Sequence, residues 1–137
     1  PFLSKRKQRE TARKYIKDLK IKTFSELSEA KSLSGGNQQK VVIAKWLYAD
    51  ADVYIFDEPT RGIDVGARDE IYNIMYELIR KKASIIMISS DLVEVLKMSD
   101  RVAVMGEGRV KAILENDGNL TQQDILKVEL AEGGSAQ

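Results

Sequence analysis

The chain has 137 residues, of which 43% are apolar and 31% are charged, and its formal net charge is +1. These values are those of an ordinary globular domain, and the balanced charge gives no electrostatic reason to expect nucleic acid or an anionic membrane surface as the main partner. Cysteine is absent, which excludes disulfides and thiolate chemistry, and histidine is absent as well.

The first half of the chain predicts two helices followed by a strand. Residues 5–20 are rich in Lys, Arg and Glu, with apolar residues at helical spacing, which predicts a solvated helix. We expect a loop with one short helical turn over 21–32. Ser34 is a suitable N-cap for a second helix that runs to about Tyr48. The apolar run VYIF at 53–56 is β-branched and aromatic, which predicts a strand buried on both faces.

The middle of the chain repeats this alternation. Asp64 can cap a third helix, where apolar residues follow the i, i+3, i+4, i+7 pattern. The run IIMI at 85–88 has the same buried-strand pattern, and a short helix from Asp91 to Lys97 follows it. Because strands alternate with helices, the predicted class is α/β.

The end of the chain predicts a hairpin and a last helix. Two short apolar runs at 102–105 and 110–114 flank Gly-Glu-Gly, which is typical of a β-hairpin. Thr121 can cap a helix that ends near Glu129. We expect the Gly-, Ser- and Ala-rich tail from Glu132 to be disordered.

Residues 33–40, LSGGNQQK, lie where a loop becomes a helix. Free backbone N–H groups and the positive end of the helix dipole favour an anion there, and two glycines allow a phosphate to come close. Ser34 adds a hydroxyl donor. The Ser-Gly-Gly triplet alone fits a serine-capped helix after a glycine turn better than an anion site. The eight residues in this order favour the anion site.

The strand at 53–56 delivers two carboxylates, Asp57 and Glu58, at its carboxyl end, where α/β sheets place ligands. An Asp there can hold Mg²⁺ through its water shell, and the next Glu can orient a water for in-line attack. Acidic residues end many strands, so the Asp-Glu pair alone leaves an ordinary strand end equally open. The continuation PTRGID at 59–64 favours the chemical interpretation.

Three strings follow each other in the order of a known family. LSGGNQQK, DEPTRGIDVGA and Ser89-Ser90-Asp91 resemble the signature motif, the linked Walker B and D-loop, and the switch segment of ABC-type ATP-binding cassettes. The resemblance covers about residues 10–115 and points to the second cassette of the tandem-cassette ATPases of bacterial monosaccharide importers, the ribose, galactose and xylose class. It implies a P-loop NTPase-like partial domain, with a mainly parallel sheet flanked by helices and a C-terminal hairpin.

The same resemblance implies a division of the chain and a role for single residues. Residues 1–32 would end a helical subdomain, 33–115 would belong to the ATPase core, and 116–137 would form a C-terminal helix and tail. Asp57 would be the Mg²⁺-associated acid, acting through water, and Glu58 the catalytic, water-polarising carboxylate. The residues implied to contact ATP bound on an opposing cassette are Ser34, Gly35, Gly36 and Gln38.

Two further positions follow from the resemblance. Asp64 would lie at the interface between cassettes, and Ser90 occupies the place of the family's switch histidine. A serine is too short to act as an imidazole does and has no ionisable group near neutral pH, so hydrolysis there would be slow or would rely on Glu58 alone. The alternative that Ser90 only caps the following helix stays open.

The sequence contains no G-x-x-x-x-G-K-[ST] loop. The cofactors ATP and Mg²⁺ both require that loop, so we expect the isolated chain to be inactive. The chain begins with Pro1 rather than methionine, and we expect it to start inside a longer protein. Its strands would then have an unprotected edge, through which a homodimer could form.

The leading hypothesis is a piece of the ATPase of a sugar importer, which couples ATP hydrolysis to monosaccharide uptake. The expected partners are an opposing ATP-binding cassette and membrane permease subunits, with no nucleic acid, and the expected place is the cytoplasmic face of the inner (cell) membrane, held peripherally. One alternative is a non-catalytic ABC interaction module, which Ser90 favours and the Asp57–Glu58 pair disfavours. The other is a soluble ABC ATPase outside transport, although neither heptads nor a basic block occurs.

Overall fold

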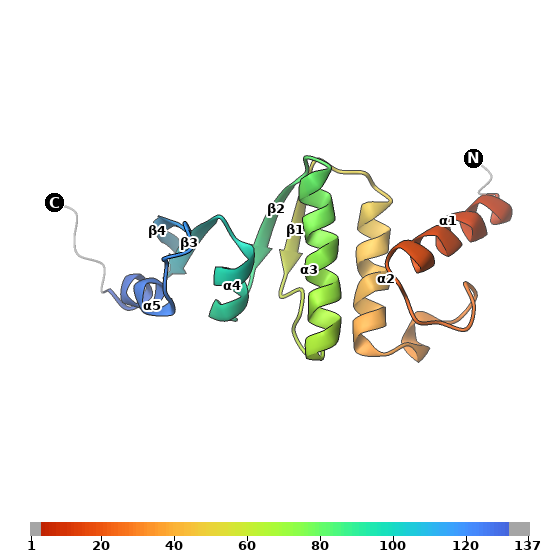
Figure 1. Ribbon diagram of the computed structural model, residues 1–137, viewed down its shortest axis with the longest axis horizontal. Coiled ribbons are helices and arrows are strands. Elements are labelled where there is room, and N and C mark those ends of the chain that lie inside the picture. Colours follow the sequence, from red (N-terminus) through yellow and green to blue (C-terminus); the bar gives the residue numbers. More distant parts are fainter. Residues whose placement is uncertain (1–3, 132–137) are drawn as a thin grey trace. The chain divides into compact units, whose positions relative to one another are not determined.

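Helices and strands alternate along the chain, which confirms the α/β class (Figure 1). The structure is a computed structural model and describes residues 4–131, so the predicted disorder of the tail from Glu132 lies outside the described residues. Four predicted helix starts are confirmed, with N-caps at Ser34, Asp64, Asp91 and Thr121. The elements in order are α1 (Lys5–Asp18), the 3₁₀ helix η1 (Ala30–Ser32), α2 (Gly35–Leu47), β1 (Val53–Asp57), α3 (Val65–Arg80), β2 (Ser84–Ile88), α4 (Leu92–Met98), β3 (Arg101–Gly106), β4 (Arg109–Glu115) and α5 (Gln122–Leu130).

Contacts group the described residues into two compact units, which divide between Ile86 and Met87. The first unit contains α1, α2, β1, α3 and the start of β2, and the second contains α4, the β3–β4 hairpin and α5. The predicted division after residues 32 and 115 follows the motifs rather than these contacts and remains a prediction.

The first unit is built on the β1–α3–β2 crossover. β1 and β2 pair in a two-stranded sheet, and both strands run in the same direction (Figure 1). A parallel pair needs such a helical connection, because a tight turn can only reverse the chain. Helix α3 lies beside α2, with both helices starting at the same end. The apolar stripe of α3 forms most of the core through Ile71, Tyr72, Ile74, Met75 and Leu78.

The prediction that both strands are buried on both faces is wrong for this chain. In β1, Tyr54 is buried, whereas Val53 and Ile55 are 53% and 67% exposed. Ile86 and Ile88 of β2 are about half exposed as well. Successive side chains of a strand point to opposite faces of the sheet, and the elements within residues 4–131 cover only one of these faces. The strands therefore contain more apolar side chains than the described residues bury.

The second unit contains the predicted hairpin, with β3 and β4 antiparallel. Glu107 and Gly108 both have positive φ, 51° and 73°, as a two-residue type I′ turn requires. Lys111, next to an irregularity in the register, donates from Nζ to the carbonyls of Glu129 and Ala131 at 2.8 and 2.9 Å. This contact holds the C-terminal end of α5, where a cation is favourable. The buried core of the unit is formed by Val102, Val104 and Ile125.

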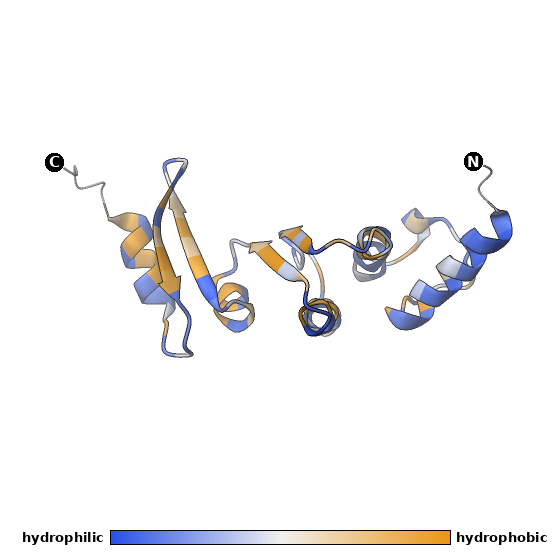
Figure 2. Cartoon of the chain, turned by 90° about the horizontal axis from the view of Figure 1, so that it is seen from above, coloured by the Kyte–Doolittle hydropathy of each residue, from blue (hydrophilic) through white to orange (hydrophobic). Residues whose placement is uncertain are grey.

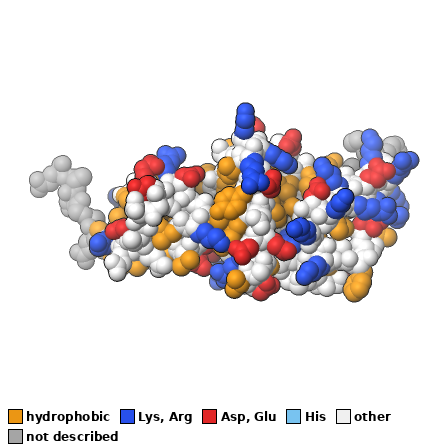
Figure 3. All heavy atoms as spheres, viewed as in Figure 1, with side chains coloured by type: hydrophobic (Ala, Val, Ile, Leu, Met, Phe, Trp, Pro, Cys, Tyr) orange, Lys and Arg blue, Asp and Glu red, His pale blue; other side chains and the backbone are white. Residues whose placement is uncertain are grey.

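Helix α1 is the predicted solvated helix. No residue of α1, which is described throughout, is buried. Figure 2 colours this helix as almost wholly hydrophilic, and Figure 3 shows Lys and Arg side chains gathered over it. Arg13 Nη2 donates to Glu26 Oε1 at 2.7 Å and attaches α1 to the loop that follows. This hydrogen bond raises the pKa of Arg13 and lowers the pKa of Glu26.

Candidate functional site

The loop-to-helix junction predicted as an anion site forms the start of α2. Ser34 is the N-cap in an extended conformation, and its carbonyl accepts from the Gln38 N–H at 2.9 Å. Its hydroxyl makes no capping bond to the helix and instead accepts from Asn37 Nδ2 at 2.8 Å. The first N–H groups of a helix have no acceptor within the helix, so they remain oriented toward an incoming anion. Ser34 thus caps α2 through its backbone, and the predicted anion site at the same helix start remains a prediction.

The two glycines of the junction have different surroundings. A Cβ on Gly35 would meet nothing within 4 Å, and this residue is exposed. A Cβ on Gly36 would lie 2.8 Å from Ala67 Cβ and 3.2 Å from Ile63 Cγ2. Gly36 is therefore required by the close approach of α2 to the start of α3, a packing role that the sequence reasoning missed. Gly35 alone offers open space next to the backbone for a phosphate.

The amide side chains of the motif hold the loop before the helix. Gln38 Nε2 donates to the carbonyl of Leu33 at 2.8 Å, which folds this side chain back over the N-cap. Asn37 Oδ1 accepts from the Lys22 N–H at 2.8 Å and so connects the motif to the segment after α1. The predicted contact of Gln38 with ATP remains a prediction, and its observed contact is within the chain.

The acidic pair lies at the end of β1, as predicted. Asp57 is the last residue of the strand and is exposed, and Glu58 follows with a φ of 46°. The other described non-glycine residues with positive φ lie after helix ends or in the hairpin turn: Lys20, Asp50, Lys82 and Glu107. Glu58 is different, because it directly follows a strand. Such left-handed backbone costs about 1–2 kcal/mol outside glycine and concentrates at functional sites.

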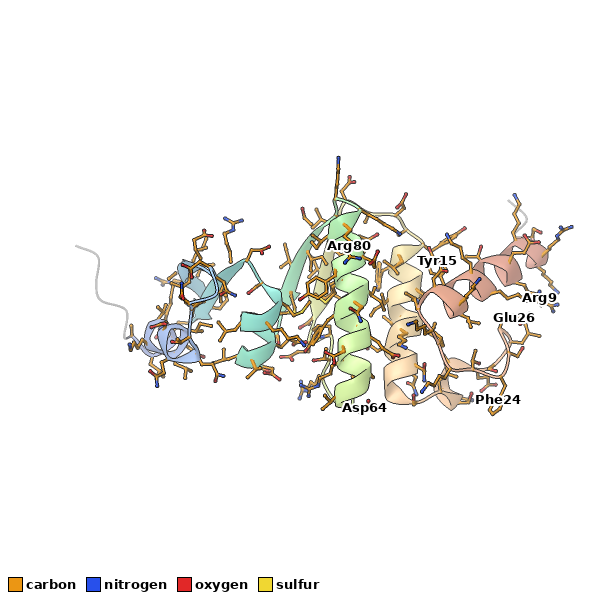
Figure 4. The ribbon with its side chains drawn as sticks, in the orientation of Figure 1. Arg9, Tyr15, Phe24, Glu26, Asp64 and Arg80 are labelled. Carbon is orange, nitrogen blue, oxygen red and sulfur yellow. The ribbon has the colours of Figure 1, made fainter. Side chains whose placement is uncertain are left out.

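Two backbone turns connect Glu58 to Asp64. The Arg61 N–H donates to the Glu58 carbonyl at 3.2 Å, and Gly62 has a φ of 72°, which only glycine adopts without strain. Asp64 Oδ1 then accepts from the Ala67 N–H at 3.0 Å and caps α3. Figure 4 shows Asp64 at the start of this helix. The side chain therefore has a structural role in addition to the predicted interface role.

Lys40, the last residue of LSGGNQQK, is a residue that the sequence reasoning missed. Its side chain is 2% exposed, and its Nζ lies 2.5 Å from Glu70 Oε2 of α3 and 3.2 Å from the Lys20 carbonyl oxygen. The signal was available, because Gly36, Lys40 and Ile43 share one helix face and all three are buried. A lysine on a buried face needs a partner, which could not be identified from the spacing alone.

The predicted switch segment belongs to the second unit. Asp91 is the N-cap of α4, and its Oδ1 accepts from the N–H groups of Val93 and Glu94 at 3.0 and 3.2 Å. The alternative that Ser90 caps this helix is therefore wrong. Ser89 Oγ donates to Oε2 of the buried Glu94 at 2.5 Å and accepts from the Asp91 N–H at 3.1 Å. Ser90, between them, is exposed.

The chain provides only part of a nucleotide and metal site. Within residues 4–131, no three Asp, Glu, His or Cys side chains gather closely enough to hold a metal ion. Magnesium is commonly held by one or two carboxylates together with substrate phosphates and water, and the exposed carboxylate of Asp57 fits that contribution. The start of α2 fits a phosphate through its N–H groups and the exposed Gly35.

Comparison with known proteins finds similar sequences and similar folds. The family model described as "ABC transporter" matches residues 3–61. A solved dimeric bacterial ABC transporter cassette superposes with a TM-score of 0.73 at 21% identity, over 86% of this chain and 51% of that one. A nucleotide-free ABC transporter cassette gives a TM-score of 0.74 at 25% identity, over 95% and 49%. The chain therefore resembles the cassettes of ABC transporters and has part of their P-loop NTPase fold.

Similar curated sequences include sugar import ATP-binding proteins. The ribose import ATP-binding protein of Geobacillus kaustophilus is 54% identical over 134 residues, which are 98% of this chain and 26% of that protein. The arabinose import ATP-binding protein of Burkholderia pseudomallei is 48% identical over 136 residues, which are 98% of this chain and 27% of that protein. The chain thus spans about a quarter of the length of the curated relatives it matches.

Proposed function

We propose that this chain is the carboxy-terminal part of the second cassette of a monosaccharide import ATPase. The observation that carries the proposal is the start of α2, where Ser34 keeps its hydroxyl off the helix N–H groups and Gly35 is open. There Ser34, Gly35 and Gly36 donate hydrogen bonds to the γ-phosphate of a nucleotide bound on an opposing cassette. Gln38 belongs to the same contact once its bond to Leu33 is released.

The carboxylates at the end of β1 serve the nucleotide site of the chain's own cassette. Asp57 would hold a magnesium ion through water, and a bound magnesium ion would supply positive charge next to the phosphates. Glu58 orients the attacking water and accepts a proton from it, and its position directly after Asp57 at the end of β1 is suited to this role. Asp64 contacts the opposing cassette, and Ser90 stands at the position of the switch residue. The 137 residues contain no G-x-x-x-x-G-K-[ST] phosphate-binding loop, which both cofactors would need.

The place and partners follow from the relatives' role in import. We place the protein at the cytoplasmic face of the cell membrane, where permease subunits would hold it peripherally. No helix among residues 4–131 is both long and apolar enough to cross a membrane itself. The open face of the β1–β2 sheet exposes four apolar side chains, Val53, Ile55, Ile86 and Ile88. Such an apolar patch indicates that another part of the protein covers this face, and the remainder of the same cassette would supply it.

Glu58→Gln in the intact transporter ATPase tests the assignment. The amide keeps the size of the side chain but cannot accept the proton of water, so ATP hydrolysis at this site is expected to fall by about 10²-fold or more while ATP binding persists. Glu107→Gln, in the exposed hairpin turn, is the matched control and should leave turnover unchanged. Unchanged turnover in Glu58→Gln would favour a non-catalytic interaction module, a function that the serine at position 90 also supports.

A further inference from the structure

An ion pair between the buried Lys40 and the partly exposed Glu70 joins the two helices whose N-caps are Ser34 and Asp64. Lys40 lies on α2 and Glu70 on α3, and the Lys20 carbonyl that also binds Lys40 Nζ belongs to the segment after α1. The lysine side chain is 2% exposed and the glutamate side chain 40% exposed. One ammonium group therefore connects three parts of the first unit.

The positions of these residues fix how far one helix is shifted along the other. Lys40 and Glu70 each lie six residues after the N-cap of their own helix, Ser34 and Asp64. Each α-helix rises by about 1.5 Å per residue, so a bond between residues at equal depth keeps the two N-caps level. One turn closer to the caps, Gly36 packs directly against Ala67. The glycine contact sets the separation of the helices, and the ion pair sets their axial register.

Stability alone does not account for a charge at this position. Well-packed apolar residues can replace a buried ion pair at little or no cost to stability, whereas removal of one partner leaves an uncompensated charge. The ion pair adds what apolar contacts do not, a directional bond of defined geometry between two particular atoms. Sliding of α2 along α3 would break this bond.

We propose that Lys40 is a positioning residue, which through Glu70 holds Ser34 level with Asp64 so that both meet the opposing cassette together. This inference rests on the proposed function, because it concerns the same signature helix. Lys40 itself touches no nucleotide. Its effect is on the geometry of the helix start, so its loss should lower the rate of hydrolysis and leave the affinity for ATP of the chain's own site unaffected.

The test compares Lys40→Met, Glu70→Gln and the double variant in the intact transporter ATPase. Glu70→Gln leaves the buried Lys40 ammonium without its charged partner and should be less stable, whereas Lys40→Met leaves a partly exposed carboxylate and should cost less. The double variant should recover stability because no charge remains. If Lys40 positions the helices, the double variant still has a kcat at least about 10-fold below that of the wild type, with KM for ATP unchanged, because small misplacements are costly in rate. A double variant that is stable and has wild-type kcat would overturn the inference. Lys45→Met, at an exposed position of the same helix, is the matched control.

A distance measurement on the full chain gives a readout that is independent of activity. The chain has no cysteine, so spin labels can be placed at Val42 of α2 and Asn73 of α3, both exposed. The distribution of label distances should broaden in the double variant and stay narrow in Lys45→Met. An unbroadened distribution would also overturn the inference. If Glu58→Gln leaves turnover unchanged, the proposed function fails, whereas normal kcat in the double variant together with an inactive Glu58→Gln refutes only the role of Lys40.

Discussion

Replacing Gly36 with alanine probes the contact between α2 and α3 that positions the candidate site. The new Cβ would lie 2.8 Å from Ala67 Cβ and 3.2 Å from Ile63 Cγ2. Favourable carbon–carbon contacts begin near 3.5 Å, so α2 must move away from α3 by roughly 0.7 Å or more. The Cβ of Ala67 is bonded directly to the backbone of α3, so it cannot rotate away as the end of a long side chain could. The substitution therefore separates the two helices at their starts.

The magnitude follows from two opposing terms. Overpacking of a tight interior contact typically costs about 1–3 kcal/mol, and alanine regains about 0.5–1 kcal/mol over glycine within a helix. We expect a net loss of about 0.5–2 kcal/mol in the free energy of unfolding. For a chain of this size, that loss corresponds to a fall in Tm of roughly 2–8 °C.

Gly35→Ala is the matched control, because it makes the same chemical change one residue earlier. Its Cβ meets nothing within 4 Å, so only the propensity term remains and the stability should be unchanged or slightly higher. Urea unfolding of the full chain, followed by circular dichroism, measures both variants. Equal stabilities of the two alanine variants would refute the packing role assigned to Gly36. In an intact ATPase, Gly35→Ala should still lower turnover, because its methyl group occupies the open space assigned to the phosphate.

Three further outcomes are expected. Calorimetric titration of the full chain with Mg-ATP should give no affinity in the low micromolar range. The chain lacks a phosphate-binding loop, whose roughly four charge-assisted hydrogen bonds would contribute on the order of 6–12 kcal/mol, whereas micromolar binding corresponds to only about 8 kcal/mol. A micromolar Kd would contradict this expectation. Light scattering should detect dimers or low stability of the isolated chain, because the β1–β2 sheet leaves apolar side chains such as Ile55 exposed, and a stable monomer with a sharp thermal transition would count against it. Hydrogen bonds from the Thr121 hydroxyl and backbone lower the pKa of Asp124. The resulting stabilisation of α5 is therefore present above the ordinary carboxyl pKa of about 3.9 and is lost as the pH falls through the lowered pKa. Asp124→Asn should remove this acid-dependent loss of stability, measured by urea unfolding between pH 7 and 3.

The local elements could be predicted because their signals are local. Ser34, Asp64, Asp91 and Thr121 are residues that commonly cap helices, and each does occupy an N-cap. The hairpin follows from a turn whose two residues adopt positive φ. The sequence does not decide between Ser90 and Asp91 as the cap of α4, because both residue types cap helices well, and the structure places Asp91 at that position.

The missed features depend on partners that are distant in sequence. Gly36 is needed because of Ala67 and Ile63, and Lys40 is buried because Glu70 is available thirty residues later. No motif spacing encodes these contacts, since they arise only when α2 and α3 lie side by side. The exposed faces of the strands have a different cause. Their apolar sequence is suited to a larger sheet, so sequence alone predicted more burial than these residues achieve.

The start of α2 and the end of β1 differ in charge, and this difference decides where a phosphate would bind to the chain by itself. Asp57 and Glu58 are acidic side chains, and without a cationic cradle they repel a polyphosphate. The start of α2 presents N–H groups and the positive end of a helix dipole, and its Gly35 is exposed. Any weak binding of ATP should therefore perturb the amide resonances of Gly35 and Gly36 in an NMR titration. Perturbation centred on Glu58, with Gly35 unaffected, would mean that the acidic strand end attracts the nucleotide unaided, and the division of roles between α2 and β1 would be wrong.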